Sequence, residues 1–453
     1  MEQGGGIEMR RLNMKLKVWI PIIAVASIVL LFGNAKAAEK TIDPEVQKWM
    51  EKDPLYKEWL EILDYYPKRD LEWEKKWVGK TIDASNVGQV KDLLPEITYL
   101  VTQSEEWGAT MKVVPARTYW RPSEGFIKAT KQYSGQVTID EKGVMHGFTG
   151  GCCFPRPGTN PSKIAWNRDR GCYEGDDFLY MGIDQRVTDA KNRTRNSGVN
   201  YCRMRYAYRT DIEPIPEVPG NITNVYRATR NTIYMPFDIK GVTVLVVKYK
   251  EPDKDDDMWT FVPTMRRVRR MSSGQRCDNI GGTDVCNDDA DIYDGEVLDN
   301  DYKWIGLRDC LLSYHLQYPY PPDVEFRNRW AHNWPVQKRP TYVFEATSNL
   351  PNFCYTKRIW YVEPMSFRIY CSTLYDRKGR LWKEQNASCD TNMDDPNNGY
   401  NNPSLMQYID WQARHATNWL FEPPEKGMNW GINKNTGAKQ DFFSVIGIKK
   451  YAH

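Results

Sequence analysis

The spacing of apolar residues changes once along this chain, from a helical period to an alternating one. Between residues 43 and 80, Trp and Leu recur every three to four positions among Glu and Lys, which predicts amphipathic helices. Pro54 and Pro67 divide the segment into pieces, because proline ends or kinks a helix. We expect this Trp stripe to pack on the domain rather than to hold a ligand. Another short helix is expected within residues 88–100.

Alternation begins after about Thr118 and predicts strands joined by hairpins. The segments with this pattern are 136–139, 143–148, 242–249, 259–262, 265–271, 342–346, 358–362, 367–375 and 380–384. One interposed helix is expected at residues 162–167, and the polar stretch 186–232 is expected to leave the sheet. Because the strands do not alternate with long helices, we expect an α+β fold, with one large twisted antiparallel sheet and helices covering one side.

The N-terminus is typical of an export signal. Basic residues precede an apolar run from Val18 to Phe32, and Ala35-Lys36-Ala37 places small residues where signal peptidase reads them. The run is short for a membrane span, which needs about 20 residues. We therefore expect a cleaved signal peptide and a mature protein in the periplasm or cell envelope. The true initiator is either Met1 or Met14.

The expected organisation has three parts: a signal peptide at residues 1–37, an N-terminal helical segment at 38–84 and a sheet domain at 85–453. Removing residues 1–37 takes five basic and two acidic residues from totals of 62 and 59, so the mature portion carries 57 of each. A net charge near zero gives no reason to expect nucleic acid as a partner. Aromatic residues make up 13% of the chain, which favours broad apolar sheet faces or a surface for an apolar ligand.

All 10 Cys residues follow the predicted signal, and an even number in an exported chain favours disulfides. The preferred pair is Cys277 with Cys286. Cys354 and Cys371, on two strands of an expected hairpin, form a separate and less favoured alternative. A local group is formed by Cys152, Cys153 and Cys172. No C-x-x-C motif is present, so neither a redox site nor attached haem is expected, and we expect no cofactor.

The motifs of common enzymes are missing. The five His residues do not fall in an H-E-x-x-H spacing, and the chain has no G-x-S-x-G elbow or phosphate-binding Gly loop. The densest acidic cluster misses the EF-hand spacing, so we expect a solvated loop, with a calcium site as the less favoured alternative. Its members are Asp284, Asp288, Asp289, Asp291 and Asp294. We expect no catalytic residues and no metal site.

A basic cluster lies on one of the expected strands. Side chains alternate along a strand, so Arg266 and Arg270 should face one way while Arg267 and Arg269 face the other. One pair could bind a lipid headgroup or the acidic rim of a partner. The alternative is cross-strand pairing with carboxylates on an exposed face.

Several strings resemble the domain-of-unknown-function 1329 family. They occur at residues 133–135, 150–157, 163–167, 236–241, 259–270, 275–276, 282–284, 302–304, 357–362 and 375–382. The resemblance implies a fold like that of outer-membrane lipoprotein-sorting proteins, the LolA, LolB and LppX carriers: a half-open antiparallel barrel closed by helices over an apolar cavity. It also implies a periplasmic partner of an RND-type lipid exporter. Gly151-Cys152-Cys153-Phe154 departs from the family, which usually has an apolar pair at the two Cys positions.

The function expected from these observations is that of a non-enzymatic carrier of a lipid or another hydrophobic molecule. An apolar cavity needs no catalytic group, because burying each CH₂ contributes about 0.8 kcal/mol. Candidate ligand contacts are Val244, Leu245, Val246, Val247, Trp259, Phe261, Arg267, Arg269, Trp360 and Phe367. Two alternatives stay open: a structural or adaptor protein of an envelope complex, and a hydrolase of lipids or glycans that uses paired acids.

Overall fold

A computed structural model describes residues 42–171, 174–271, 276–317, 325–327, 329–332, 334–391, 402–421, 431–434 and 437–451. The chain divides into two units, Met1–Ile42 and Asp43–His453, and every described helix and strand belongs to the second. The predicted signal peptide lies outside the described residues. Among the helices that these ranges contain, none has both the length and the apolar character needed to cross a bilayer.

The helical segment predicted from residue 43 is confirmed as three helices, α1 (Pro44–Lys52), α2 (Pro54–Leu63) and α3 (Leu71–Trp77). The side chain of an Asp accepts a hydrogen bond from a first-turn N–H of each helix, which satisfies a donor that the helix leaves free. Pro54 starts α2 rather than interrupting it, because the first helical position needs no N–H.

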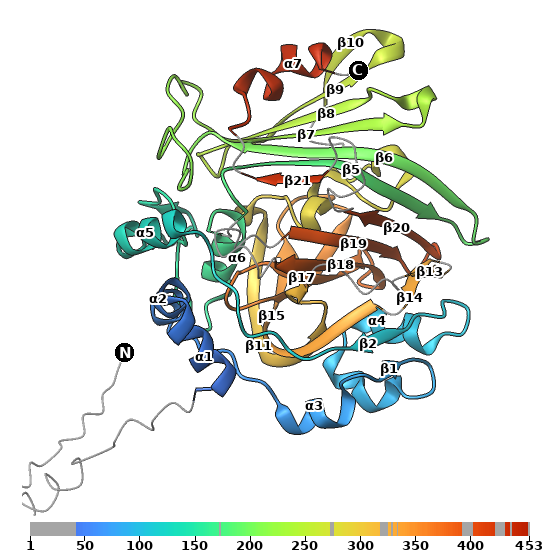
Figure 1. Cartoon of the computed structure of the whole chain (residues 1–453). Coiled ribbons are helices and arrows are strands. Elements are labelled where there is room, and N and C mark those ends of the chain that lie inside the picture. The colour runs from blue at the N-terminus through green and yellow to red at the C-terminus, as the bar shows by residue number, and fades with distance from the viewer. Residues whose placement is uncertain are drawn as a thin grey trace, which may run out of the picture. The chain divides into compact units, whose positions relative to one another are not determined.

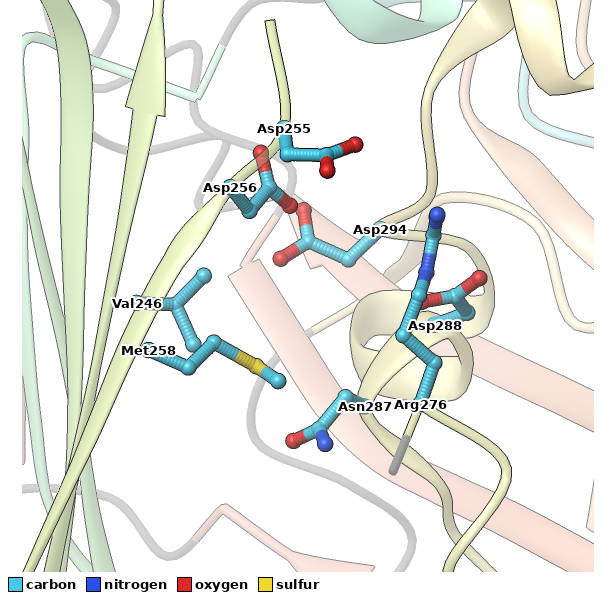
Figure 2. Close-up of a pocket in the computed structure, with 8 residues that line it drawn as sticks. All are labelled: Val246, Asp255, Asp256, Met258, Arg276, Asn287, Asp288 and Asp294. Carbon is cyan, nitrogen blue, oxygen red and sulfur yellow. The ribbon is translucent and has the colours of Figure 1, made fainter. Parts of the chain in front are cut away.

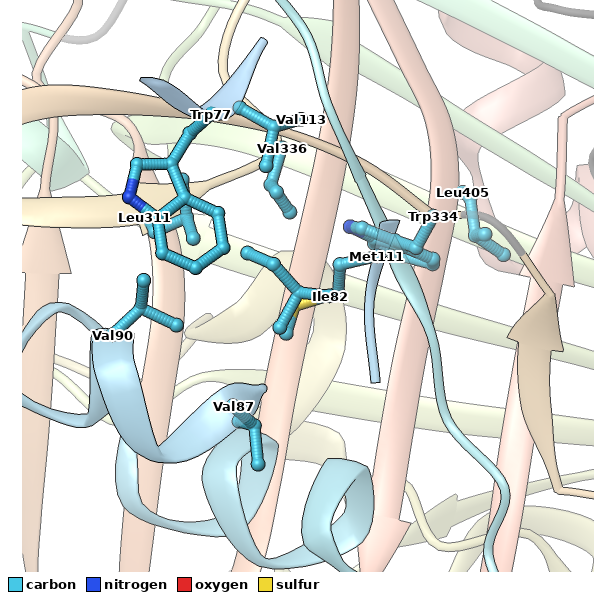
Figure 3. Close-up of a cluster of buried hydrophobic side chains, with 10 residues drawn as sticks. All are labelled: Trp77, Ile82, Val87, Val90, Met111, Val113, Leu311, Trp334, Val336 and Leu405. Atoms are coloured by element: carbon cyan, nitrogen blue, oxygen red, sulfur yellow. The ribbon is translucent and has the colours of Figure 1, made fainter. Parts of the chain in front are cut away.

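The N-terminal helices pack on the sheet domain. The indole N–H of Trp59 donates to the carbonyl oxygen of Met365 at 3.2 Å, and the Tyr56 hydroxyl donates to that of Thr118 at 2.7 Å. Figure 3 shows Trp77 at the end of α3 in contact with a cluster of buried apolar side chains. That cluster also contains Ile82, Val87, Val90, Met111, Val113, Leu311, Trp334, Val336 and Leu405. The helical segment is therefore part of the same compact unit as the sheet.

The main sheet has 17 strands, and an antiparallel path runs through most of them. One half contains, in order of pairing, β10 (Arg267–Met271), β9 (Asp257–Val262), β8 (Thr243–Tyr249), β7 (Val225–Met235), β6 (Thr194–Arg205) and β5 (Asp177–Thr188). The other half continues from β5 with β20 (His415–Leu420), β19 (Asn402–Asp410), β18 (Leu381–Thr391), β17 (Ile369–Asp376), β16 (Tyr355–Val362), β15 (Trp334–Ser348) and β11 (Asn300–Leu312). In Figure 1 the green strands β5–β7 and the orange to brown strands β15–β20 are successive parts of this sheet.

Shorter strands extend the sheet or stand apart from it. In the main sheet, β2 (Met111–Val113) pairs in parallel with β15 and in antiparallel with β1 (Thr81–Ile82). The strands β12 (Leu316–Gln317) and β21 (Gly431–Lys434) pair with β18 and β5, respectively. Two small hairpins are separate: β3 (Thr138–Ile139) with β4 (Met145–His146), and β13 (Glu325–Arg327) with β14 (Trp330–His332). The first of them is the hairpin predicted at 136–148.

Helices cover the sheet, and the predicted α+β class is confirmed. The segment η1 (Val87–Leu93) and α4 (Glu96–Gln103) pack near β11 and β18, and α6 (Pro161–Asp169) is the interposed helix predicted at 162–167. The helix α5 (Glu124–Tyr133) contacts α2. At the C-terminal end, η10 (Gln440–Phe443) and α7 (Val445–Lys450) lie against β6–β9, and Figure 1 shows α7 beside these strands.

One prediction about the sheet is wrong. The stretch 186–232 does not leave it, because all of β6 and most of β7 lie in the middle of one half. The physical reason is that buried positions on these strands carry Arg, as at Arg203, Arg227 and Arg230, which hides the alternation of apolar and polar residues. Apart from the short turn at 189–193, only the connection 206–224, with its prolines, lies outside the strands.

Candidate functional site

A loop that carries six carboxylates is buried against strands of both halves of the sheet. We call residues 284–296 the acidic loop, and each of its acidic residues is at most 8% exposed. These residues are Asp284, Asp288, Asp289, Asp291, Asp294 and Glu296. The predicted solvated loop is therefore wrong for this segment. The reason is that strands distant in sequence supply partners for the charges, which no local pattern reveals.

Two ion pairs connect the acidic loop to opposite halves of the sheet. Lys248 of β8 donates to Glu296 at 2.7 Å. Arg358 of β16 donates to Asp289 at 3.0 Å, and both side chains are almost fully buried. The loop therefore joins β8 to β16, which are far apart along the path of the sheet.

Further arginines complete the network. Arg168 of α6 donates to Asp291 at 2.9 Å, and Arg368, which precedes β17, donates to the other oxygen of the same carboxylate. Arg227 of β7 donates to Asp294. Burial by itself raises the pKa of Asp294, but the charges of Arg227 and other neighbouring cations lower it below its ordinary value. Among the described residues, paired charges therefore occupy much of this face of the sheet, beside a cluster of buried, mostly aromatic side chains that contains Val285 of the loop.

The cavity left beside the acidic loop is small, and most of the residues that line it are polar. Figure 2 shows Val246 of β8 and Met258 of β9 on one side, with Asp288 and Asp294 of the loop on the other. Its volume is about 30 Å³. That is enough for water and far below the about 300–1,000 Å³ of a typical ligand pocket.

Asp256 lines the same cavity and has the feature that a hydrolase would require. Burial raises the pKa of Asp256 to about 8, although the positive charge of Lys248 by itself lowers it. The Lys248 Nζ lies 2.9 Å from the Asp256 carboxylate. A carboxyl group with a raised pKa beside Asp294 could act as a general acid. The cavity, however, has no room for a glycan or a lipid beside these groups, so the geometry gives the hydrolase hypothesis no substrate site here.

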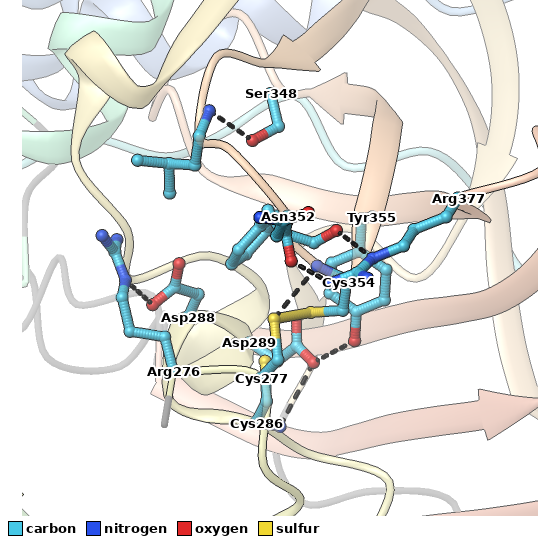
Figure 4. Close-up of a disulfide and its surroundings, with 12 residues drawn as sticks. Arg276, Cys277, Cys286, Asp288, Asp289, Ser348, Asn352, Cys354, Tyr355 and Arg377 are labelled. Carbon is cyan, nitrogen blue, oxygen red and sulfur yellow. Dashed lines mark hydrogen bonds and ion pairs between the residues drawn. A yellow bond between two sulfur atoms is a disulfide. The ribbon is translucent and has the colours of Figure 1, made fainter. Parts of the chain in front are cut away.

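The disulfide that the structure contains joins Cys277 to Cys354, with Cα atoms 5.8 Å apart (Figure 4). The predicted pair Cys277–Cys286 is wrong, and so is the alternative Cys354–Cys371. The loop after Cys277 turns inward, so that Cys286 lies buried with its N–H donating to Asp289. Cys354, directly before β16, lies half-buried beside Cys277. This contact spans 77 residues and has no local signature in the sequence.

The second group of predicted disulfide cysteines is only partly described. Cys152 and Cys153 are fully buried between α5 and α6. The N–H of Cys152 donates a hydrogen bond to the hydroxyl oxygen of Thr130 at 2.8 Å. Cys172 lies outside the described residues. A disulfide within this group stays a prediction.

A larger cavity lies on the opposite face of β5–β7, beneath η10 and α7. Neighbouring residues of a strand face opposite sides, so Lys248 faces the acidic loop while Val247 packs in the cluster under α7. We call the cavity the α7 groove, and its volume is about 380 Å³. Its lining residues are Met181, Asn200, Cys202, Arg230, Thr232, Ile233, Tyr234, Lys240, Phe442, Lys450 and Tyr451. This volume falls within the range of ligand pockets.

Of the three cations that line the α7 groove, Arg230 is the buried one, at 1% exposed. Its guanidinium donates to the carbonyl oxygens of Phe442, Gly447 and Tyr451. Within the described part of the chain no carboxylate forms an ion pair with it, and burial lowers its pKa to about 10. A buried cation bonded only to neutral groups favours a nearby anion. In the sequence, Ser444 before an apolar run indicates the helix α7. Nothing in the sequence indicates that the carbonyl groups around this helix contact Arg230 of β7.

The predicted ligand contacts do not surround one cavity. Val246 lines the small cavity, while Phe261 packs in the cluster under α7 with Leu245, Val247 and, at its edge, Trp259. Trp360 is buried against the ring of Tyr293, with ring centroids 4.7 Å apart. The remaining aromatic candidate, Phe367, is buried in the turn before β17, and Val244 is half-buried on β8. Their role as ligand contacts stays a prediction.

The basic cluster on β10 is exposed. Arg267 and Arg269 both point to solvent, and β10 pairs with β9 alone among the described strands. Arg270 forms an ion pair with Asp257 of β9, which is the cross-strand pairing given above as the alternative. Arg266 is not part of the strand, because it adopts a left-handed conformation at φ 51° in the turn. The predicted alternation therefore fails at this residue.

The described residues define an α+β protein with a large, curved antiparallel sheet, an ion-paired loop on one face and a helix-covered groove on the other. Residues 81–448 match the family described as "Protein of unknown function (DUF1329)", so the chain belongs to this family. The resemblance drawn from the sequence strings is thereby confirmed.

Solved structures of low sequence identity resemble the chain. A domain described as an outer membrane lipoprotein-sorting protein, from Vibrio parahaemolyticus, is 16% identical, with a TM-score of 0.45 over 64% of this chain and 98% of that one. A DUF1329 family protein from Desulfovibrio piger is 15% identical, with a TM-score of 0.43 over 60% and 92%. A LolA superfamily protein from Nitrosomonas europaea is 14% identical, with a TM-score of 0.38 over 62% and 94%. No curated protein matches the chain.

Proposed function

We propose that this protein is a non-enzymatic carrier of the cell envelope and that the α7 groove holds its hydrophobic cargo. The observation that supports this proposal is the groove itself, whose volume is about 380 Å³ and whose lining includes Met181, Ile233 and Phe442. A chain of CH₂ groups in such a groove is retained by about 0.8 kcal/mol for each group buried. The binding therefore needs no reactive side chain.

Arg230 defines the polar end of the proposed cargo. It lies at the buried side of the groove, whereas Lys240 and Lys450 are exposed at its rim. None of the residues that line the groove carries a carboxylate. The ligand class that fits is an amphiphile with an apolar chain and an anionic group, such as a carboxylate or a phosphate.

The place of the carrier in the cell is part of the proposal. The signal-like sequence of residues 1–37 supports export to the periplasm or cell envelope. The family resemblance favours an RND-type exporter or an outer-membrane protein as the partner that delivers or receives the cargo. The proposed partner chemistry includes no nucleic acid, because the mature portion has no excess of basic residues.

The proposal is tested by binding to the chain from Ala38 onward, which is the mature protein expected from the signal-like sequence. We expect it to purify with lipid detectable by mass spectrometry and to bind a fluorescent apolar probe. Met181→Trp places a larger side chain in the groove. It should weaken probe binding by about tenfold, a loss of free energy equal to that of about two buried CH₂ groups. A fatty acid should displace the probe at a lower concentration than the alcohol of equal chain length, because only the acid offers a charge to Arg230.

Leu307→Trp is the matched control, since Leu307 is 53% exposed on β11 and does not line the groove. It should bind the probe like the wild type. Absence of lipid from the purified protein, together with equal probe binding by Met181→Trp and the wild type, would contradict the carrier proposal. The comparison of acid with alcohol uses the wild type and remains informative if Met181→Trp misfolds.

An adaptor protein of an envelope complex is the second candidate. The observation that favours it is the acidic loop, which occupies much of one face of the sheet with ion pairs such as Arg358–Asp289. An adaptor would use its surface for contacts and would show no cargo. Lipid analysis of the purified protein separates the two candidates, because only the carrier retains a defined amphiphile.

A further inference from the structure

Exposed apolar side chains gather at one end of the sheet. Of the eleven large hydrophobic residues that are exposed in the described chain, seven lie on the β7–β8 turn, the β9–β10 turn and α7. They are Met235, Phe237, Ile239, Met265, Val445, Ile446 and Tyr451. Phe237 is 93% exposed and Ile446 is 77% exposed, so neither packs against the rest of the protein. Such gathering marks an interaction surface.

Strand pairing places the three segments together. Thr243 and Phe261 are the terminal pair of β8 and β9, so the turn before β8 and the turn after β9 leave the sheet at the same end. Lys240 of the first turn lines the α7 groove with Lys450 and Tyr451. We call residues 235–241, 263–267 and 445–451 the tip surface, and its first and third segments border the α7 groove.

The tip surface is basic. Lys240, Arg266, Arg267 and Lys449 are exposed, and none has an ion-pair partner among the described residues. Asp238 is the single acidic residue in the three segments. Lys450 is already paired, at 2.9 Å, with Asp441 outside them. The exposed apolar side chains are therefore interleaved with uncompensated positive charge.

We infer that the tip surface docks on an anionic lipid bilayer, with Phe237, Met265 and Ile446 inserted among the headgroups and the basic side chains on lipid phosphates. Each basic side chain near an anionic membrane contributes about 1 kcal/mol, and apolar side chains add the gain of leaving water. A protein partner would need a complementary face of about 800 Å². Side chains that protrude singly, as Phe237 and Met265 do from turns and Ile446 does from the start of α7, suit a lipid interface, which deforms around each one. Docking would bring the rim of the α7 groove to the membrane.

Vesicle sedimentation tests this inference. The wild type should bind vesicles that contain phosphatidylglycerol more tightly than vesicles of phosphatidylcholine alone. The triple variant Phe237→Ser, Met265→Ser, Ile446→Ser should partition to the anionic vesicles about tenfold less. The variant Arg266→Gln, Arg267→Gln, Lys449→Gln, which changes no residue that lines the α7 groove, should lose the preference for phosphatidylglycerol, because the charges that contact the phosphates are gone.

Matched controls change equally exposed side chains elsewhere. Ile215→Ser, Ile222→Ser, Leu307→Ser replaces residues that are 43%, 92% and 53% exposed, and Lys142→Gln, Lys191→Gln, Lys378→Gln removes three exposed charges. Both controls should bind vesicles like the wild type. Equal binding by the tip variants and their controls, or no binding by the wild type, overturns the inference. Unchanged vesicle binding with loss of an envelope protein from pull-downs would assign the surface to a protein partner and overturn it too.

The inference stands apart from the carrier proposal. Met181→Trp alters the groove and leaves the tip surface intact, so it should bind the apolar probe about tenfold more weakly and still bind vesicles like the wild type. The tip variants should bind anionic vesicles more weakly than the wild type and still bind the probe in solution. Failure of one proposal is therefore distinguishable from failure of the other.

Discussion

Glu363 lies in the turn between β16 and β17, fully buried, 3.0 Å from the guanidinium of Arg339 on β15. The N–H groups of Met365 and Ser366 donate to its second carboxylate oxygen. Burial by itself raises the pKa of Glu363, but the charges of Arg339 and His315 lower it to about 2. The fold therefore stabilises the ionised form. The same arrangement, a buried carboxylate held by a strand arginine, recurs in the acidic loop at Asp289 with Arg358 and at Asp294 with Arg227.

Glu363→Gln should lower the free energy of unfolding at pH 7 by about 3–5 kcal/mol, because it leaves Arg339 buried without its counter-ion. The folded pKa of Glu363 lies below its ordinary value, so the ion pair stabilises the protein above about pH 4.5 and loses that effect as the pH falls toward about 2. The difference between variant and wild type in urea unfolding should therefore shrink over that interval.

Glu72→Gln is the control for this prediction. Glu72 pairs with Lys75 at 2.6 Å, but its side chain is 84% exposed, so its removal should cost less than about 1 kcal/mol. A loss at pH 7 for Glu363→Gln no larger than for Glu72→Gln would show that the buried pair does not stabilise the fold.

At the scale of elements, the sequence predicts the structures that depend on local signals and misses those that depend on contacts between distant residues. Helices α1–α3 begin at Asp caps and follow a 3.6-residue period, so the sequence predicts them closely. The strands β6 and β7 were missed because their buried arginines break the apolar alternation. The acidic loop was misassigned for the complementary reason, since its carboxylates find those arginines only in the folded chain. The Cys277–Cys354 bond belongs to the same class of distant contacts.

The double variant Cys277→Ser, Cys354→Ser should lower the free energy of unfolding by about 4 kcal/mol in the chain-entropy account, because the disulfide closes a loop of 77 residues. Guanidinium unfolding of the variant and the wild type measures this difference. Peptide mapping of the wild type should recover Cys277 linked to Cys354. Recovery of a Cys277–Cys286 peptide would contradict the structure.

At the scale of the whole molecule, the family match begins at residue 81, yet the compact unit begins at Asp43. The helices before residue 81 bury Tyr56, Trp59 and Trp77 against the sheet domain and its strands. They complete the apolar cover of the sheet, and the molecule cannot lose them without exposing that face.

A truncated variant that starts at Thr81 should therefore unfold at a lower temperature than the mature protein or aggregate, because it exposes the surface that Trp59 and Trp77 cover. A variant that starts at Asp43 keeps these helices and should retain the melting temperature of the mature protein. Calorimetry of both variants tests this, and equal melting temperatures for the two would show that the helical segment adds no stability.

The sequence by itself determined the helical segment, the hairpins within β8–β10 and β15–β18, the α+β class and the family, because these depend on the period of apolar residues and on local turn chemistry. Only the tertiary structure decided which charges are buried, which cysteines pair and where a cavity remains. Those outcomes depend on contacts between strands far apart in the chain, such as Lys248 with Glu296 or Arg230 with the carbonyl groups around α7. A buried charge and a solvated one have the same appearance in a sequence until the partner that offsets its desolvation is in place.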